Sequence, residues 1–302
     1  VYQTSGVGKF LLSRHAQNHG IKAVITGEGA DEILAGYPSF KEDYLMNCLS
    51  NNNCGHLFKK LLNENKQISS AYVSCNEYPE LLNIQNCLGY TPSFLKLSCE
   101  ISRVTRQILS NRYLHAPPEN HCPFNAFLSE INQQMMKGLG FVEKSQYLWS
   151  ISFFPELILS YLGDRMEMAH SIEGRLPFLD AELVTFVNSL PINFKINNAL
   201  TGKILLRDAM KNLVPETIRT RKKHIFSAPT ISKHRHDKNA MLNLMQQVFT
   251  DHSFKKMGTH KQEKVLRLLN ALPNMKKRTK MITEFALHAA LSTYFLRASY
   301  NV

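Results

Sequence analysis

The chain of 302 residues has a formal net charge of +12, with 44% hydrophobic and 20% charged residues. This length can bury a substantial core, as one large domain or two small ones, and the composition is typical of a soluble globular protein. No apolar run approaches the ~20 residues of a membrane helix, so we expect no contact with a membrane. The first residues also lack the basic-then-apolar layout of a signal peptide, which favours a cytoplasmic protein.

Two further features bear on the type of protein. The chain begins with Val1 rather than Met, so we expect it to start partway through a longer protein. Its six cysteines lie within one third of the sequence, and none forms a C-x-x-C pair: Cys48, Cys54, Cys75, Cys87, Cys99 and Cys122. We therefore expect reduced thiols, and neither a zinc site nor a disulfide framework.

The positive charge is concentrated in three clusters, at residues 219–224, 233–238 and 276–280. Such clusters can neutralise nucleic-acid phosphates. They lack the interleaved aromatic residues that favour binding of single strands. We interpret the second and third clusters as solvated surface and do not expect nucleic acid as a partner.

The first predicted element is a helix over residues 6–18, which ends at Gly20 in a glycine cap. Residues 5–9 differ from a phosphate-binding loop because their first glycine is misplaced. In addition, Phe10 occupies the position at which Ser or Thr would bind the metal. We therefore reject that motif.

The rest of the chain is organised around the next stretch. Residues 21–26 are apolar and β-branched, which predicts one buried strand. Gly27 and Gly29 follow as a turn, and a helix starts after them. Strand, glycine turn and helix start together point backbone N–H groups at an anion.

This turn also carries three acidic side chains, Glu28, Asp31 and Glu32. Carboxylates suit a phosphate that arrives with Mg²⁺. The alternative is an ordinary strand-to-helix turn, in which Asp31 stabilises the helix dipole and Glu28 is solvated.

The remaining pattern is mainly helical, with Pro38 breaking the next helix. We expect helices at 40–49, 92–114, twice within 124–161 around a break at 138–140, at 180–190, at 203–213, and in two or three pieces over 241–295. Polar or glycine-containing segments predict loops at 51–55, 63–79 and 228–237. No internal repeat is apparent.

Three blocks of sequence resemble the motifs of one enzyme family. The first is Thr-Gly-Glu-Gly-Ala-Asp-Glu at residues 26–32, followed by Gly36-Tyr37. The second is the stretch 164–180, which ends in Pro-Phe-Leu-Asp, and the third comprises 201–207, 213–215 and 221–226. In this order and spacing they are similar to the glutamine-hydrolysing asparagine synthase family, and they cover residues 1 to about 230.

The resemblance implies a fold. The synthetase domain of that family has a small parallel sheet surrounded by helices, of the adenine-nucleotide α-hydrolase (PP-loop ATPase) type. We therefore expect an α/β fold that is predominantly helical, with a partial parallel sheet. Residues 1–302 would form a truncated synthetase domain, with a residual nucleotide-binding part at 1–50 and a mainly helical part at 51–302.

The resemblance also implies a reaction. Family members activate a carboxylate, aspartate or a similar one, with ATP and Mg²⁺; pyrophosphate leaves, and ammonia then displaces AMP. By this resemblance Glu28 positions or deprotonates ammonia, and Lys223 stabilises the phosphate charge, with Lys222 as the alternative in a shifted register. Asp31 would be the ligand of the Mg²⁺-pyrophosphate.

Further contacts follow from the same resemblance. The nucleotide would contact Thr26, Gly27 and Gly29. Arg165 or Arg175 would hold phosphate or close the pocket, and a structural salt bridge to Glu173 or Asp180 is the alternative. Residues 177–180 are interpreted as a rigid turn and helix cap rather than as chemistry.

The sequence departs from the family in two ways. The family's Ser-Gly-Gly-x-Asp-Ser loop, which holds pyrophosphate, occurs nowhere in the 302 residues, and neither does a glutaminase domain with an N-terminal cysteine. We expect ammonia to come from a glutaminase domain or subunit, and a homodimer is left open. A catalytically incomplete binding or scaffold module, and a related adenylating enzyme such as a β-lactam synthetase, remain alternatives. The intact Glu28, Asp31 and Lys223 favour an enzyme.

Overall fold

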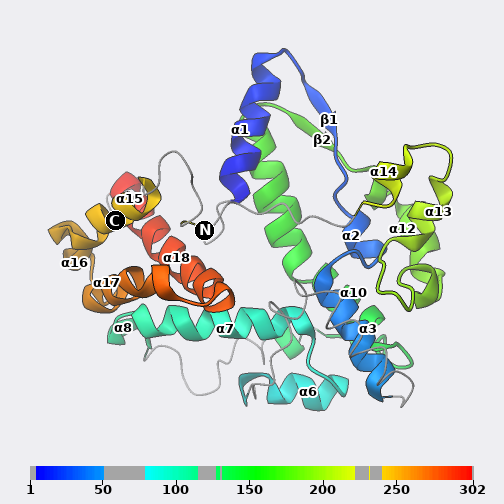
Figure 1. Ribbon diagram of the computed structural model, residues 1–302, viewed down its shortest axis with the longest axis horizontal. Coiled ribbons are helices and arrows are strands. Elements are labelled where there is room, and N and C mark those ends of the chain that lie inside the picture. Colours follow the sequence, from blue (N-terminus) through cyan, green and yellow to red (C-terminus); the bar gives the residue numbers. More distant parts are fainter. Residues whose placement is uncertain are drawn as a thin grey trace.

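The computed structural model describes residues 5–50, 79–114, 127–129, 131–221, 231 and 240–300, without the side chains of residues 49 and 50. Over these residues the chain is mostly helical and contains a two-stranded parallel sheet (Figure 1). The expectation of a predominantly helical α/β fold with a small parallel sheet is confirmed to this extent.

The first unit is α1 (Ser5–Asn18) followed by β1 (Ala23–Ile25). Gly20 has a φ of +73°, and its N–H donates to the carbonyl of Gln17 at 2.9 Å. This left-handed glycine reverses the chain after the helix, as the sequence predicts.

Strand β1 pairs in parallel with β2 (Glu173–Arg175), with Val24 opposite Gly174. The prediction of a buried strand at 21–26 is wrong in two respects. The strand is only three residues long, and Ile25 is 80% exposed. Successive strand residues point to opposite faces. Ala23 and Ile25 share the face that the described residues leave open, so only Val24 is half-buried.

After the glycine turn come α2 (Ala30–Ile33) and α3 (Pro38–Ser50), then η1 (Pro79–Leu81) and α6 (Leu82–Leu88). Helix α7 (Ser93–Ile108) and α8 (Asn111–Leu114) replace the single helix predicted at 92–114. The helix stops because Leu109 is extended and forms an antiparallel bridge with His260, far along the sequence.

The central segment contains α10 (Phe141–Ser150), the π-helix η2 (Phe154–Asp164) and α11 (Arg165–Met168). Turns at 133–138 occupy part of the first helix predicted within 124–161, so that prediction is only partly confirmed. After β2 come η3 (Pro177–Leu179), α12 (Ala181–Ser189), η4 (Ile192–Phe194), α13 (Ile204–Ala209) and α14 (Glu216–Arg219). Helix α13 is shorter than the predicted 203–213.

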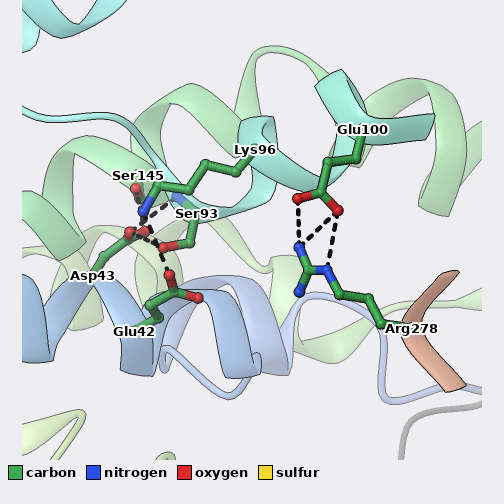
Figure 2. A network of polar contacts seen from close by, with 7 residues as sticks. All are labelled: Glu42, Asp43, Ser93, Lys96, Glu100, Ser145 and Arg278. Carbon is green, nitrogen blue, oxygen red and sulfur yellow. Dashed lines mark hydrogen bonds and ion pairs between the residues drawn. The ribbon is translucent and has the colours of Figure 1, made fainter. Parts of the chain in front are cut away.

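The C-terminal segment forms four helices where two or three were predicted: α15 (Ala240–Thr250), α16 (His252–Met257), α17 (Gln262–Ala271) with η5 (Leu272–Asn274), and α18 (Lys277–Tyr300). They share a core that includes Phe249, Phe254 and Leu287, and α18 lies along α7. The Arg278 guanidinium makes a bidentate contact with Glu100 of α7, in which Nη2 donates to Oε1 at 2.8 Å and Nε donates to Oε2 at 3.1 Å, and this contact joins the two helices (Figure 2).

A buried aspartate connects α3 to the helical remainder. Asp43 accepts hydrogen bonds from the backbone N–H of Ser93 (3.0 Å), the Ser93 hydroxyl (2.6 Å) and the Ser145 hydroxyl (2.6 Å) (Figure 2). These donors come from α7 and α10, so one side chain joins three helices. The division of the chain at residue 50 stays a prediction.

Two remaining expectations concern the type of protein. Cys48, Cys87 and Cys99 are free thiols, and the other three cysteines lie outside the described residues. None of the helices within the described ranges combines the length and apolarity needed to cross a bilayer.

Candidate active site

The glycine turn continues directly from β1. The Thr26 N–H donates to the carbonyl of Arg175 at 2.9 Å, which extends the pairing of the two strands by one residue. Gly29 then adopts a φ of +91°, and its carbonyl accepts from the N–H of Ile33 at 3.0 Å to start α2. A Cβ at Gly29 would lie 2.4 Å from Leu179 Cδ2, so glycine is required both by conformation and by space.

The second sequence block therefore packs against the first. Leu179 belongs to η3, and the next residue, Asp180, caps α12. The Asp180 carboxylate accepts from the N–H groups of Glu182 and Leu183, both at 3.0 Å. The interpretation of residues 177–180 as a turn and helix cap is confirmed.

Residues of the third block also pack against the glycine turn and α2. A Cβ at Gly202 would lie 2.7 Å from the carbonyl oxygen of Ala35, so this close backbone approach requires glycine. Next to it, the Lys203 N–H donates to the Leu34 carbonyl at 3.1 Å, and Lys203 Nζ lies 2.9 Å from Asp31 Oδ1. Described residues of all three blocks, although distant in sequence, thus meet at one turn: Leu179 of the second block and Gly202 with Lys203 of the third lie against the first.

Asp31 has basic side chains close to its carboxylate. Its carboxylate fits into space left by Gly36, whose Cβ would lie 2.0 Å from Asp31 Oδ1, and it is ion-paired with Lys203. Lys41 is close by: burial lowers the pKa of this lysine, and the charge of Arg207 lowers it further. Positive charge from Lys203 and Arg207 thus lies beside the acidic side chains of the turn.

The arrangement around Asp31 does not by itself fit Mg²⁺. Over the part of the chain that the structure describes, no three His, Cys, Asp or Glu side chains cluster where they could hold a metal ion. Asp31 supplies a single carboxylate, and its partner is an ammonium group. Its role as a ligand of phosphate-borne Mg²⁺ stays a prediction.

Glu32 has a structural role in the turn. It is buried, and it accepts a hydrogen bond from the Tyr37 hydroxyl at 2.7 Å. Burial raises the pKa of Glu32 and raises that of Tyr37 far above its usual range. The side-chain amide of Gln146, in α10, donates to the carbonyls of Glu32 and Ile33 and so caps α2. No local sequence signal pointed to Gln146.

Glu28 projects from the turn and is partly exposed. Its Oε1 lies 3.6 Å from Nζ of Lys9, and the same ammonium lies 3.4 Å from Oε1 of Glu167. Beside it, Thr26 Oγ1 is buried and has no hydrogen-bond partner among the described residues. A buried hydroxyl without a partner is costly. The unpaired Thr26 hydroxyl agrees with the predicted contact between Thr26 and a nucleotide, which would supply the missing hydrogen bond.

The two arginines of the second block differ. Arg175 pairs with Glu173 at 3.0 Å, with both side chains exposed, so the salt-bridge alternative holds for this residue. Arg165 is exposed on α11 without an ion pair to any described residue. Its predicted contact with phosphate is untested.

Lys222 and Lys223 lie outside the described residues, but the structure shows what holds the residues on either side. The Arg207 guanidinium donates to the carbonyls of Gly202 (3.1 Å), Arg221 (2.9 Å) and Arg219. Beyond the basic segment, the N–H of Ile231 donates to Oε1 of Glu284 at 3.2 Å. Burial raises the pKa of Glu284 to about 7.

Known proteins resemble this chain over most of its length. It is 29% identical over 238 residues to "Amidase chyE" of Penicillium rubens and 25% identical over 239 residues to "Amidase chry2" of Gibberella zeae, each covering 74% of this chain and 35% of the relative. "Asparagine synthetase [glutamine-hydrolyzing] 1" of Bacillus subtilis is 26% identical over 264 residues, which are 80% of this chain and 36% of that protein. The chain thus spans about a third of the length of these relatives, and no solved structure matches it.

The family model for asparagine synthase matches residues 1–294, nearly the whole chain. All three sequence blocks lie within this match. The chain belongs to the asparagine synthase family.

Proposed function

We propose that this chain is part of an ATP-dependent enzyme that converts a carboxylate into an amide. The observation that carries the proposal is that described residues of all three sequence blocks meet at one turn, which holds Glu28 and Asp31 at the carboxyl end of β1. Ligands of open parallel sheets bind at this end of the strands. The family supports a fold of the adenine-nucleotide α-hydrolase type.

The proposed first step is adenylation. An oxygen of the substrate carboxylate attacks the α-phosphorus of ATP, the bond to the bridging oxygen breaks, and pyrophosphate leaves with that electron pair. The Thr26 hydroxyl and the N–H groups of the turn bind the nucleotide. Lys223 stabilises the charge that develops as pyrophosphate departs.

The second step forms the amide. The lone pair of ammonia attacks the acyl carbon, and the bond from that carbon to the AMP oxygen breaks with its electrons going to AMP. The nitrogen passes one proton to the Glu28 carboxylate, which acts as a general base. The overall products are an amide, AMP and pyrophosphate.

The substrate is proposed only as a class. Aspartate is one candidate because a relative is named as an asparagine synthetase. Two other relatives are named as amidases, and both kinds of name refer to an amide bond. A panel of carboxylates is therefore needed, with aspartate as one member.

The test uses the full product of the gene that encodes this chain. The first step is measured by the exchange of labelled pyrophosphate into ATP, which should depend on an added carboxylate. The two steps together are measured by the amide and AMP that form when ammonia is supplied. Glu28→Gln should retain exchange and lose amide formation. A gene product that shows no carboxylate-dependent exchange with any member of the panel contradicts the proposal and favours a binding or scaffold module.

A further inference from the structure

Lys9 is a charged side chain in the candidate site to which the mechanism above assigns no role. It belongs to α1, and its Nζ lies 3.6 Å from Glu28 Oε1 and 3.4 Å from Glu167 Oε1. The side chains are 16%, 28% and 7% exposed for Lys9, Glu28 and Glu167 respectively. One ammonium group therefore bridges a partly exposed carboxylate and a buried one.

Glu167 is the fixed member of this group. It is buried, and a Cβ at Gly174 would lie only 2.0 Å from its Oε2. Gly174 is the central residue of β2 and pairs with Val24 of β1. The strand pairing that leads into the glycine turn thus also makes the space in which Glu167 is held.

Glu28 is held less closely than Glu167. It is the most exposed of the three, and Lys9 is its ion-pair partner among the described residues. An ion pair that is partly exposed contributes little to the stability of a fold. It can still restrict the direction of a side chain, because the ammonium is itself held by a buried carboxylate.

We propose that Lys9 is a positioning residue for Glu28 in the amide-forming step, an inference that rests on the proposed function. Glu167 anchors the Lys9 ammonium, and the ammonium orients the Glu28 carboxylate towards the acyl-adenylate. The proton from the attacking nitrogen goes to Glu28, and Lys9 takes no part in this transfer. Adenylation, the first step, does not use Glu28 as a base. Lys9 therefore affects the amide-forming step and not adenylation.

The contact itself can be tested without activity. A carbodiimide joins an ammonium and a carboxylate in direct contact as an amide, and peptide mass spectrometry locates the link. We expect a link between Lys9 and Glu28 in the 302-residue chain. The Lys96–Glu42 pair, at 3.4 Å and less exposed, is the positive control. A link at Lys96–Glu42 without one at Lys9–Glu28 overturns the inference.

The role is tested by separating the two steps in the full gene product. For Lys9→Met we expect carboxylate-dependent pyrophosphate exchange within about twofold of the unsubstituted protein. Amide formation should fall about 10- to 100-fold, the scale of a misplaced general base. Lys9→Arg should recover most of this loss because it retains a cation within reach of both carboxylates.

The matched control is Lys96→Met, which breaks a lysine–glutamate pair of similar length outside the candidate site. It should leave both steps unchanged. Unchanged amide formation in Lys9→Met, or an equal loss of both steps, overturns the positioning role. If the unsubstituted protein shows no exchange while the Lys9–Glu28 link forms, the proposed function fails and the role of Lys9 fails with it, although the contact stands.

Discussion

At the scale of single residues, Gly29 determines whether the turn can form. An alanine at this position would adopt a φ of +91° and place its Cβ 2.4 Å from Leu179. The left-handed conformation costs about 1 kcal/mol and the clash adds to it, so Gly29→Ala should lower the free energy of unfolding by about 3 kcal/mol. Urea denaturation measures this loss.

Gly20 provides the control for that substitution. It has a φ of +73°, but a Cβ there would meet no atom within 4 Å. Gly20→Ala should therefore cost only about 1 kcal/mol, the conformational part alone. Equal losses at the two glycines would show that the contact with Leu179 is unimportant.

Lys223 is the second prediction at this scale. If it stabilises charge only as pyrophosphate leaves, its interaction is stronger in the transition state than in the ground state. Lys223→Ala should then lower kcat of the full gene product by about 10²–10³-fold and change the KM for ATP much less. Steady-state kinetics of AMP release measure both.

Neighbouring variants test the register of this prediction. Lys222→Ala should be mild, and Lys223→Arg should recover little activity because a planar guanidinium does not replace a compact ammonium. A large loss of kcat in Lys222→Ala with none in Lys223→Ala would show that Lys222, and not Lys223, has the predicted role.

At the scale of elements, α3, α7 and α10 meet around two buried acids, Asp43 and Glu42. Burial raises the pKa of Glu42 from 4.5 to about 7, although the Lys96 ammonium lowers it in part. Burial likewise raises the pKa of Asp43 from 3.8 to about 6, against its hydrogen bonds from Ser145 and Ser93. The charge of Asp43 also raises the pKa of Glu42.

These shifts give a pH dependence of stability. Between about pH 4 and pH 7 the folded chain binds more protons at Glu42 and Asp43 than the unfolded chain does. The free energy of unfolding contributed by these two groups is therefore greatest near pH 4 and falls as the pH rises to 7. For Glu42 the change is of order 2–3 kcal/mol.

Glu42→Gln tests this prediction because glutamine keeps the size but does not titrate. Between pH 4.5 and pH 7 the free energy of unfolding should fall less for the variant than for the unsubstituted chain. The difference between the two decreases should be roughly the change assigned to Glu42. Urea denaturation at several pH values measures the slopes. Parallel slopes would show that Glu42 is charged in the folded chain across this range.

At the scale of the whole molecule, the described part of the chain leaves apolar surface open around α1, β1 and α11. Exposed side chains there include Val7 (58%), Leu12 (59%), Ile25 (80%) and Met168 (66%). The sequence Ser-Gly-Gly-x-Asp-Ser, which the family uses to hold pyrophosphate, is also absent from residues 1–302.

We therefore expect that the 302-residue chain alone does not convert aspartate, ATP and ammonia to asparagine and AMP. The leaving group would lack a binding loop, and pre-organised electrostatic contacts supply much of the rate in such reactions. A steady-state assay of AMP on the purified chain measures this, with Glu28→Gln as the background. AMP release above that background would show that other residues hold the pyrophosphate.

Local signals in the sequence predicted several elements correctly. Gly20 follows the end of α1, Asp180 caps α12, and Pro38 marks a break between helices, because each of these signals acts on residues next to it. Helix α3 nevertheless starts at Pro38 itself, two residues before the predicted 40–49. Strand β2 was missed because Glu-Gly-Arg has no strand pattern of its own. It becomes a strand by pairing with β1, and α7 ends early because Leu109 pairs with His260.

The sequence by itself determined the family and the glycine turn with its acids, since these depend on residues that are adjacent in the chain. The tertiary structure decided which charges meet: Lys203 with Asp31, and Lys9 with both Glu28 and Glu167. An ion pair needs its two groups within about 4 Å, and residues far apart in the chain reach that distance only through the β1–β2 register and the close contact at Gly202.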